Sequence, residues 1–222
     1  MSTDIGSELR GSASPVSMHI KELPTPADPA PLGLAAFALT TFLLSAQNAN
    51  WTKGTAPFLG FAFAYGGLCQ LLAGMWEFRN RNVFGATAFS TYGGFWIGLA
   101  IYFELVAPAA KNAHQVSNDL GWILLAFLIF NTYMLLWSSA VNLAVFTVFL
   151  TLEATELILV IANFSNSTTG AHIGGYLGVL TAAAAWYTSA AGVINGMRGR
   201  PVLFVGQPLV RPVESIGIGE RV

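Results

Sequence analysis

Six long apolar runs constrain this chain most, because each is long enough to cross a membrane. A helix needs about 20 predominantly apolar residues to span the hydrocarbon of a bilayer. Charged residues make up only 9% of the chain, against about 25% in a typical soluble domain. The runs cover residues 31–48, 58–76, 84–106, 120–137, 141–162 and 172–194. The sequence therefore predicts an all-α membrane protein with six transmembrane helices.

The connections between these runs are short, which favours one helical unit with a tail at each end. We expect a disordered tail at residues 1–27, a transmembrane domain at 28–197 and a second tail at 198–222. The first tail is polar and lacks the apolar core of a cleavable secretion signal. The single cysteine, Cys69, lies inside the second run, so no disulfide is expected.

Basic residues predict the orientation in the membrane. With six spans, eight of the ten basic residues fall on one side: Arg10, Lys21, Arg79, Arg81, Arg198, Arg200, Arg211 and Arg221. Only Lys53 and Lys111 fall on the other side. Because cytoplasmic loops carry the excess of Lys and Arg, both termini are expected in the cytoplasm. The expected location is the plasma (inner) membrane.

The start of the first run has an unusual local pattern, Asp28-Pro29-Ala30-Pro31-Leu32-Gly33-Leu34. The prolines fix φ just ahead of a helix, where backbone N–H groups are unpaired anyway. Asp28 would lie near the positive end of the helix dipole, and Gly33 permits close backbone approach. Two interpretations remain. Asp28, Pro29 and Gly33 either form an entrance that receives a small anion, or they are a helix start signal with Asp28 as its cap.

Two glutamates, Glu153 and Glu156, lie in the middle of the fifth apolar run. Residues three apart share one face of a helix. Burying a carboxylate in a membrane costs several kcal/mol unless it is paired, solvated or protonated. We interpret the two as a proton-carrying pair, with a structural role at a subunit interface as the alternative. Glu77, beside Arg79 and Arg81, is expected to form a solvated ion pair.

Two sequence blocks resemble the acetate uptake transporter family, also called the succinate–acetate permease family. The family's signature is Asn-Pro-Ala-Pro-Leu-Gly-Leu, matched here from Pro29 to Leu34 with Asp28 in place of the asparagine. The second block is Phe84-Gly-Ala-Thr-Ala-Phe-Ser-Thr-Tyr-Gly-Gly-Phe-Trp96, which opens the third run. Between them, Tyr65, Gly66, Gly67, Gln70, Ala73, Gly74 and Glu77 fall where the family has similar residues.

The resemblance implies a function and an assembly. Members of this family have six helices per protomer, and form a ring of six protomers that each have a pore. They move acetate and related small carboxylates such as succinate, in several members together with protons. Three apolar side chains narrow the family's pore, and by position they correspond to Phe37, Tyr92 and Leu152. No cofactor, metal ion or enzymatic activity is implied.

The six runs contain no Lys or Arg, so an anion in such a pore would depend on neutral donors or on a proton. The candidate donors are Thr40, Asn48, Gln70, Thr87, Tyr92, Asn131 and Tyr187. Among these, Gln70, Thr87 and Asn131 are the predicted substrate-binding residues, and interhelical hydrogen bonding is the alternative for each. The family usually has apolar residues where this chain has Glu153 and Glu156.

Other classes of protein fit the sequence less well. A non-transporting sensor or scaffold of the same fold is the alternative function. An intramembrane enzyme is disfavoured because Glu153 and Glu156 have no nearby histidines for a dimetal site, and a retinal protein because no run carries a lysine. The chain has no phosphate-binding glycine loop and no basic patch for nucleic acid. The expected partners are a small carboxylate, protons, the bilayer and further copies of the chain.

Overall fold

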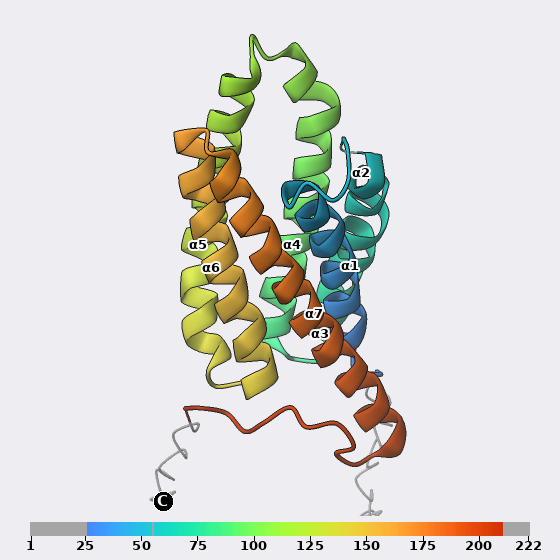
Figure 1. Cartoon of the computed structure of the whole chain (residues 1–222). Coiled ribbons are helices and arrows are strands. Elements are labelled where there is room, and N and C mark those ends of the chain that lie inside the picture. The colour runs from blue at the N-terminus through green and yellow to red at the C-terminus, as the bar shows by residue number, and fades with distance from the viewer. Residues whose placement is uncertain (1–25, 55, 211–222) are drawn as a thin grey trace, which may run out of the picture.

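The computed structural model describes residues 26–54 and 56–210, and within them every element of secondary structure is a helix (Figure 1). The elements are α1 (Ala30–Asn48), α2 (Ala56–Phe63), η1 (Ala64–Cys69), α3 (Gln70–Arg79), α4 (Val83–Ile101), η2 (Tyr102–Val106), η3 (Ala107–Ala109), α5 (Ala113–Ser138), α6 (Leu143–Ser165) and α7 (Thr168–Arg198). They form six helices long and apolar enough to cross a membrane. The predicted fold class is confirmed.

Most of these helices begin at a polar cap. Side-chain oxygens of Asn82, Asn112, Asn142 and Ser167 each accept a backbone N–H three residues ahead, at 2.9–3.1 Å. Such caps satisfy donors that a helix start leaves unpaired. They also explain why the fourth and sixth helices are longer than their predicted apolar runs. α5 begins at Ala113 and α7 at Thr168, directly after Asn112 and Ser167.

Small residues bring α1 and α7 into close contact. A Cβ atom added to Gly175 of α7 would lie 2.8 Å from the carbonyl carbon of Asn48 and from the carbonyl oxygen of Ser45, both on α1. The Gly174 and Gly178 pair, which has the small-xxx-small spacing, is also packed against other helices. Gly94 and Gly98 on α4 have the same spacing but no atom within 4 Å of their Cβ positions.

The contact at Gly175 gives a prediction about stability. Gly175→Ala is expected to lower the melting temperature of the detergent-solubilised protein, because a methyl group there meets backbone atoms that cannot move aside. Forcing extra atoms into a packed interior costs about 1–3 kcal/mol. Gly196→Ala, on the same helix, is the matched control, since its Cβ position is open. Equal melting temperatures for the two variants would contradict the predicted packing.

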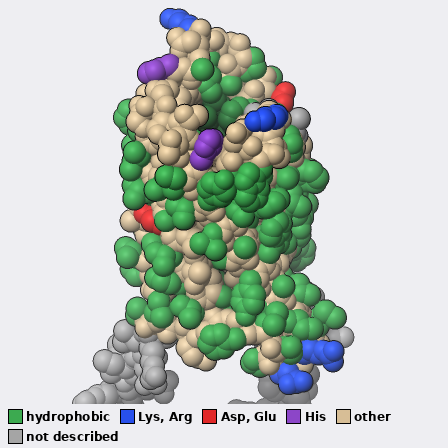
Figure 2. Space-filling model, in the orientation of Figure 1, with side chains coloured by type: hydrophobic (Ala, Val, Ile, Leu, Met, Phe, Trp, Pro, Cys, Tyr) green, Lys and Arg blue, Asp and Glu red, His purple; other side chains and the backbone are tan. Residues whose placement is uncertain are grey.

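On the face that Figure 2 shows, hydrophobic side chains cover much of the middle of the molecule, and Lys and Arg side chains lie toward its two ends. Arg79 and Arg198 end α3 and α7 at the same end of the bundle at which α1 begins. Lys53 and Lys111 lie in the connections at the opposite end. The chain is a multi-pass membrane protein. The cytoplasmic orientation of its termini stays a prediction.

The predicted tails are described only in part. Residues 1–25 of the first tail and 211–222 of the second lie outside the described residues. Residues 199–210 run across the ends of α5 and α6 (Figure 1). Ala144 N–H donates to the Val205 carbonyl at 2.9 Å, and Leu209 N–H donates to the Ser139 carbonyl at 2.8 Å. This segment is therefore packed against the helices.

Candidate functional site

Three adjoining cavities follow one another along the inside of the bundle. The outer cavity, of about 200 Å³, lies near the end of α1 and is lined by Asn48, Leu124 and Asn163 among others. The middle cavity, of about 40 Å³, shares Leu44, Asn48, Leu124 and Leu159 with it. The inner cavity, of about 20 Å³, lies toward the start of α1 and includes Leu34 and Gln70.

The middle and inner cavities share three lining residues, Phe37, Tyr92 and Leu152. They come from α1, α4 and α6, and each is at most 6% exposed. The rings of Phe37 and Tyr92 meet edge to face with their centroids 5.6 Å apart. A cavity needs about 10–15 Å³ to hold one water, so the space on either side admits only a few waters. The three residues predicted as a constriction thus line both of the two smaller cavities described here.

Close backbone contacts hold these helices together around the cavities. A Cβ atom at Gly66 would lie 2.7 Å from Cβ of Thr40 on α1, and one at Gly93 would lie 2.7 Å from the backbone nitrogen of Leu71 on α3. Gly66 belongs to η1, a π-helical turn that interrupts the second span. Such turns are frequent at functional sites. Here η1 is followed directly by Gln70, which lines the inner cavity.

Asn131 of α5 links Tyr92 to Glu153. The Tyr92 hydroxyl donates to Asn131 Oδ1 at 3.0 Å. Asn131 Nδ2 donates to Glu153 Oε2 at 2.7 Å and to the Phe149 carbonyl at 3.1 Å. Thr132 Oγ1 donates to the other oxygen of Glu153 at 2.7 Å. Both hydrogens of the Asn131 amide are therefore used inside the protein.

Glu156 lies beside this network, with Oε1 3.4 Å from the Tyr92 hydroxyl. A tyrosine hydroxyl has one hydrogen to donate. With that hydrogen on Asn131, a hydrogen bond between Tyr92 and Glu156 requires a hydrogen from Glu156. A protonated Glu156 thus completes the network, whereas an ionised Glu156 competes with Asn131 for the Tyr92 hydrogen. The two glutamates, which were predicted to share one helix face, are thus linked through Tyr92 and Asn131.

Several buried polar atoms along the path have no hydrogen-bond partner in the described part of the chain. In residues that line the middle cavity these are Thr41 Oγ1, Trp96 Nε1 and Glu156 Oε2. In the inner cavity it is Gln70 Oε1. Thr41 and Trp96 were not predicted. Trp96 ends the second matched block, but nothing in the sequence reveals which buried N–H lacks a partner.

The other predicted substrate-binding residues lie elsewhere. Thr87 and Asn131 do not line these three cavities. Asp28 is exposed, and its Oδ1 accepts the backbone N–H of Ala30 at 2.9 Å, the contact expected of a helix start signal. Pro29 accepts the N–H of Gly33 at the same start of α1. A role of these residues in substrate binding stays a prediction.

The expectation for Glu77 was wrong. Its side chain is fully buried, and neither carboxylate oxygen has a hydrogen-bond partner within the described ranges. It turns toward α4, where a Cβ atom at Gly85 would lie 2.6 Å from Glu77 Oε1. The missing side chain of Gly85 makes room for the carboxylate inside the bundle. Proximity to Arg79 and Arg81 in sequence was therefore no guide to its surroundings.

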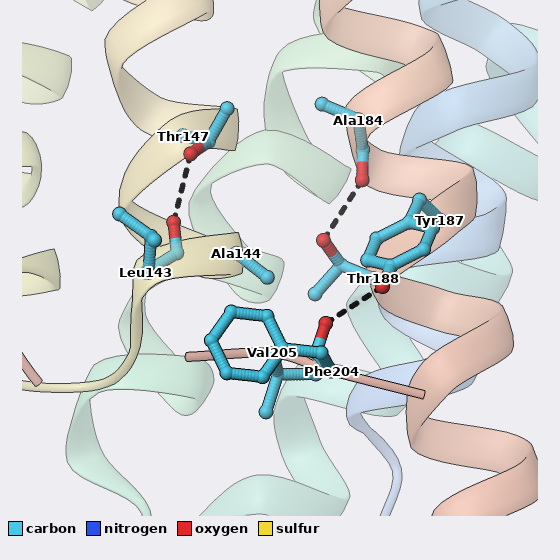
Figure 3. A pocket seen from close by; sticks show the side chains of 8 residues that line it. All are labelled: Leu143, Ala144, Thr147, Ala184, Tyr187, Thr188, Phe204 and Val205. Carbon is cyan, nitrogen blue, oxygen red and sulfur yellow. Dashed lines mark hydrogen bonds between the residues drawn. The ribbon is translucent and has the colours of Figure 1, made fainter. Parts of the chain in front are cut away.

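A fourth cavity, of about 270 Å³, lies between α6, α7 and residues 204–205 (Figure 3). Tyr187, predicted as a candidate donor, points toward Phe204 and donates its hydroxyl to that residue's carbonyl at 2.7 Å. Thr147 and Thr188 donate to carbonyls of their own helices. This cavity is apolar, its polar groups are satisfied, and it shares no lining residue with the three cavities of the path.

The fold and the site together define a multi-pass α-helical membrane protein with a row of small internal cavities between its helices. The chain belongs to the GPR1/FUN34/yaaH family, which it matches over residues 10–200. The resemblance identified from the two sequence blocks is thereby confirmed.

Named relatives include both fungal and bacterial proteins. Acetate permease A of Emericella nidulans is 43% identical over 185 residues, covering 76% of this chain and 62% of the relative. The succinate-acetate/proton symporter SatP of Escherichia coli is 33% identical over 186 residues, covering 82% and 96%. The chain therefore spans about three-fifths of the length of the fungal relatives it matches. The solved structure of the bacterial acetate channel SatP superposes with a TM-score of 0.76 at 31% identity, covering 82% of this chain and 99% of that one.

Proposed function

We propose that the chain is a transporter or channel for acetate and related small carboxylates in the plasma membrane, coupled to protons. The observation that carries the proposal is that Phe37, Tyr92 and Leu152 line both of two small cavities, whose mainly apolar walls hold a few buried polar side chains. The relatives named as acetate permease, succinate-acetate/proton symporter and acetate channel support the same substrate class. These three residues form the neck of the path.

An apolar neck suits a small carboxylate. Its hydrocarbon end tolerates dry walls, whereas a hydrated inorganic ion would lose its water there at high cost. None of the residues that line the three cavities is a lysine or arginine. Passage of a carboxylate therefore depends on neutral donors, with Gln70 on the inner side of the neck, or on a proton that cancels its charge.

Glu153 and Glu156 are the proton-carrying groups in this proposal. The Tyr92–Asn131–Glu153 network leaves the Tyr92 hydroxyl without a hydrogen for Glu156, which favours a protonated Glu156. Because Tyr92 also belongs to the neck, loss of that proton would draw its hydroxyl toward Glu156. Proton binding and the width of the neck are thereby linked.

We also propose that the chain assembles as a homo-oligomer, a hexamer as the resemblance implies. Gly94 and Gly98 support this, because they lie on α4 with open space at their Cβ positions. A stripe of small residues permits close approach of a second helix in a membrane. Each protomer would then keep its own path.

Uptake of labelled acetate into proteoliposomes tests the function. We expect uptake above that of empty liposomes, and a faster initial rate when the outside is more acidic than the inside. The stimulation follows because external acid supplies the proton that Glu156 carries inward. Folded protein that gives no uptake would contradict the proposal and favour a non-transporting sensor of the same fold. Uptake that ignores the gradient would contradict the proton coupling alone.

A further inference from the structure

The middle cavity brings three unpaired polar groups to one place. Thr41 comes from α1, Trp96 from α4 and Glu156 from α6. They are 6%, 2% and 4% exposed, and Thr41 Oγ1, Trp96 Nε1 and Glu156 Oε2 have no partner among the described residues. A buried polar atom without a hydrogen bond costs about 1–3 kcal/mol. Three such atoms, each in a residue that lines the same small cavity, suggest a ligand that completes them.

We propose that the middle cavity is a binding site for one small monocarboxylate, held by Trp96, Thr41 and a protonated Glu156. The inference rests on the proposed function and deepens it, because it names the residues that hold the substrate beside the neck.

The chemistry of the three groups fits a carboxylate. An indole N–H only donates, a threonine hydroxyl can donate, and an ionised carboxylate only accepts. Protonated Glu156 adds a third donor, and hydrogen bonds to a charged acceptor are the stronger kind. An ionised Glu156 would instead repel the substrate. The site therefore binds the carboxylate together with one proton, which stays on the Glu156 side of the hydrogen bond or passes to the substrate.

Among the described residues that line the middle cavity there is no Lys or Arg, so only protonation removes the negative charge of Glu156. Tyr92 from α4 and Glu153 from α6 are the titratable groups that interact with it. The neighbouring helices contribute neutral groups there: Thr41 and Ser45 from α1, Asn131 from α5, and Thr181 from α7 through Thr155. Substrate binding in this site is thus expected to strengthen as the pH falls.

The rest of the cavity sets the size of the ligand. Phe95, Leu124 and Leu152 form apolar walls, which suit a short hydrocarbon end. The volume of about 40 Å³ favours acetate over longer chains. A second carboxylate on the substrate would face these apolar walls, so a monocarboxylate is the expected ligand.

Trp96→Phe and Thr41→Val test the site, because each removes one donor; valine keeps nearly the shape of threonine, and phenylalanine keeps an aromatic ring at position 96. We expect each to raise the half-saturating acetate concentration for uptake roughly three- to tenfold, the effect of one lost hydrogen bond. We also expect added acetate to raise the melting temperature of each solubilised variant by less than it raises that of the native chain. Trp122→Phe and Thr188→Val are the matched controls, because Trp122 is exposed on α5 and Thr188 lines the cavity of Figure 3.

The two measurements separate failure of the site from failure of the function. Uptake with all four variants equal to the native chain would overturn the site and leave the proposed function standing. If the native chain gives no uptake, yet acetate raises its melting temperature and Trp96→Phe or Thr41→Val abolishes that rise, the site stands and transport fails. Absence of both uptake and acetate-dependent stabilisation, from folded protein, would overturn both.

Discussion

Leu152→Trp is expected to reduce acetate uptake at least about tenfold, and Phe37→Ala is expected to increase it. Leu152 is 6% exposed and packs against Phe37 and Tyr92 between two cavities that admit only a few waters. An indole at this position fills the space that a substrate needs. Crowding a packed site costs about 1–3 kcal/mol, and each 1.4 kcal/mol on a barrier slows passage about tenfold.

Phe37→Ala acts in the opposite direction because it removes the ring that meets Tyr92 edge to face. We expect faster acetate uptake and weaker discrimination against longer carboxylates such as succinate. Initial rates for labelled acetate and succinate, in proteoliposomes that contain equal amounts of folded protein, give both quantities. The ratio of the two rates reports selectivity independently of how much protein is active.

Leu157→Trp is the control for this prediction. Leu157 lies on α6, as Leu152 does, but it is 47% exposed on the outer surface of the protomer. A tryptophan there adds the same volume without entering the path. Equal loss of uptake in Leu152→Trp and Leu157→Trp would mean that the larger side chain disturbs α6 as a whole. It would contradict a role of Leu152 in the neck.

The three neck residues came from the family resemblance, and their role as a neck stays a prediction. Phe37 follows the first matched block and Tyr92 lies inside the second, and the structure places both with Leu152 along the same two cavities. The membrane spans could be predicted directly from the sequence, since the length and composition of an apolar run predict a crossing helix. The runs did not predict where each helix begins, because N-terminal caps such as Asn112 and Ser167 decide this locally.

The hydrogen-bond network of Tyr92, Asn131, Glu153 and Glu156 could not be predicted from the sequence. The partners of Tyr92 are 39 and 64 residues away, on α5 and α6. Their meeting depends on how the helices pack, for which a single sequence carries no signal.

Glu77 shows the same limit, since the absence of a side chain at Gly85 makes room for its carboxylate inside the bundle. Sequence placed Glu153 and Glu156 on one helix face, but only the fold gives Glu156 a cavity and Glu153 the partners Asn131 and Thr132.

The Glu153→Gln/Glu156→Gln double variant is expected to take up acetate but to lose the stimulation by an inward proton gradient. Glutamine has nearly the shape of protonated glutamic acid, and its amide always offers hydrogen-bond donors. At position 156 it imitates the protonated state permanently, so acetate can bind without a proton to carry. Glu156→Leu removes the donor altogether, and we expect it to weaken uptake at every pH.

The contrast between these substitutions distinguishes a proton carrier from a structural residue. If Glu156 has only a structural role, the glutamine variant should keep the response to the proton gradient. Glu156→Leu should then lower the melting temperature, because its defect is in folding. Glu104→Gln is the matched control, because Glu104 is exposed in η2, outside the lining of the three cavities. If the double variant and Glu104→Gln respond to the gradient like the native chain, the proton passes by another route. Because Glu156 faces both the Tyr92 hydroxyl of the neck and the middle cavity, loss of the response in the double variant alone would place the proton where substrate and neck meet.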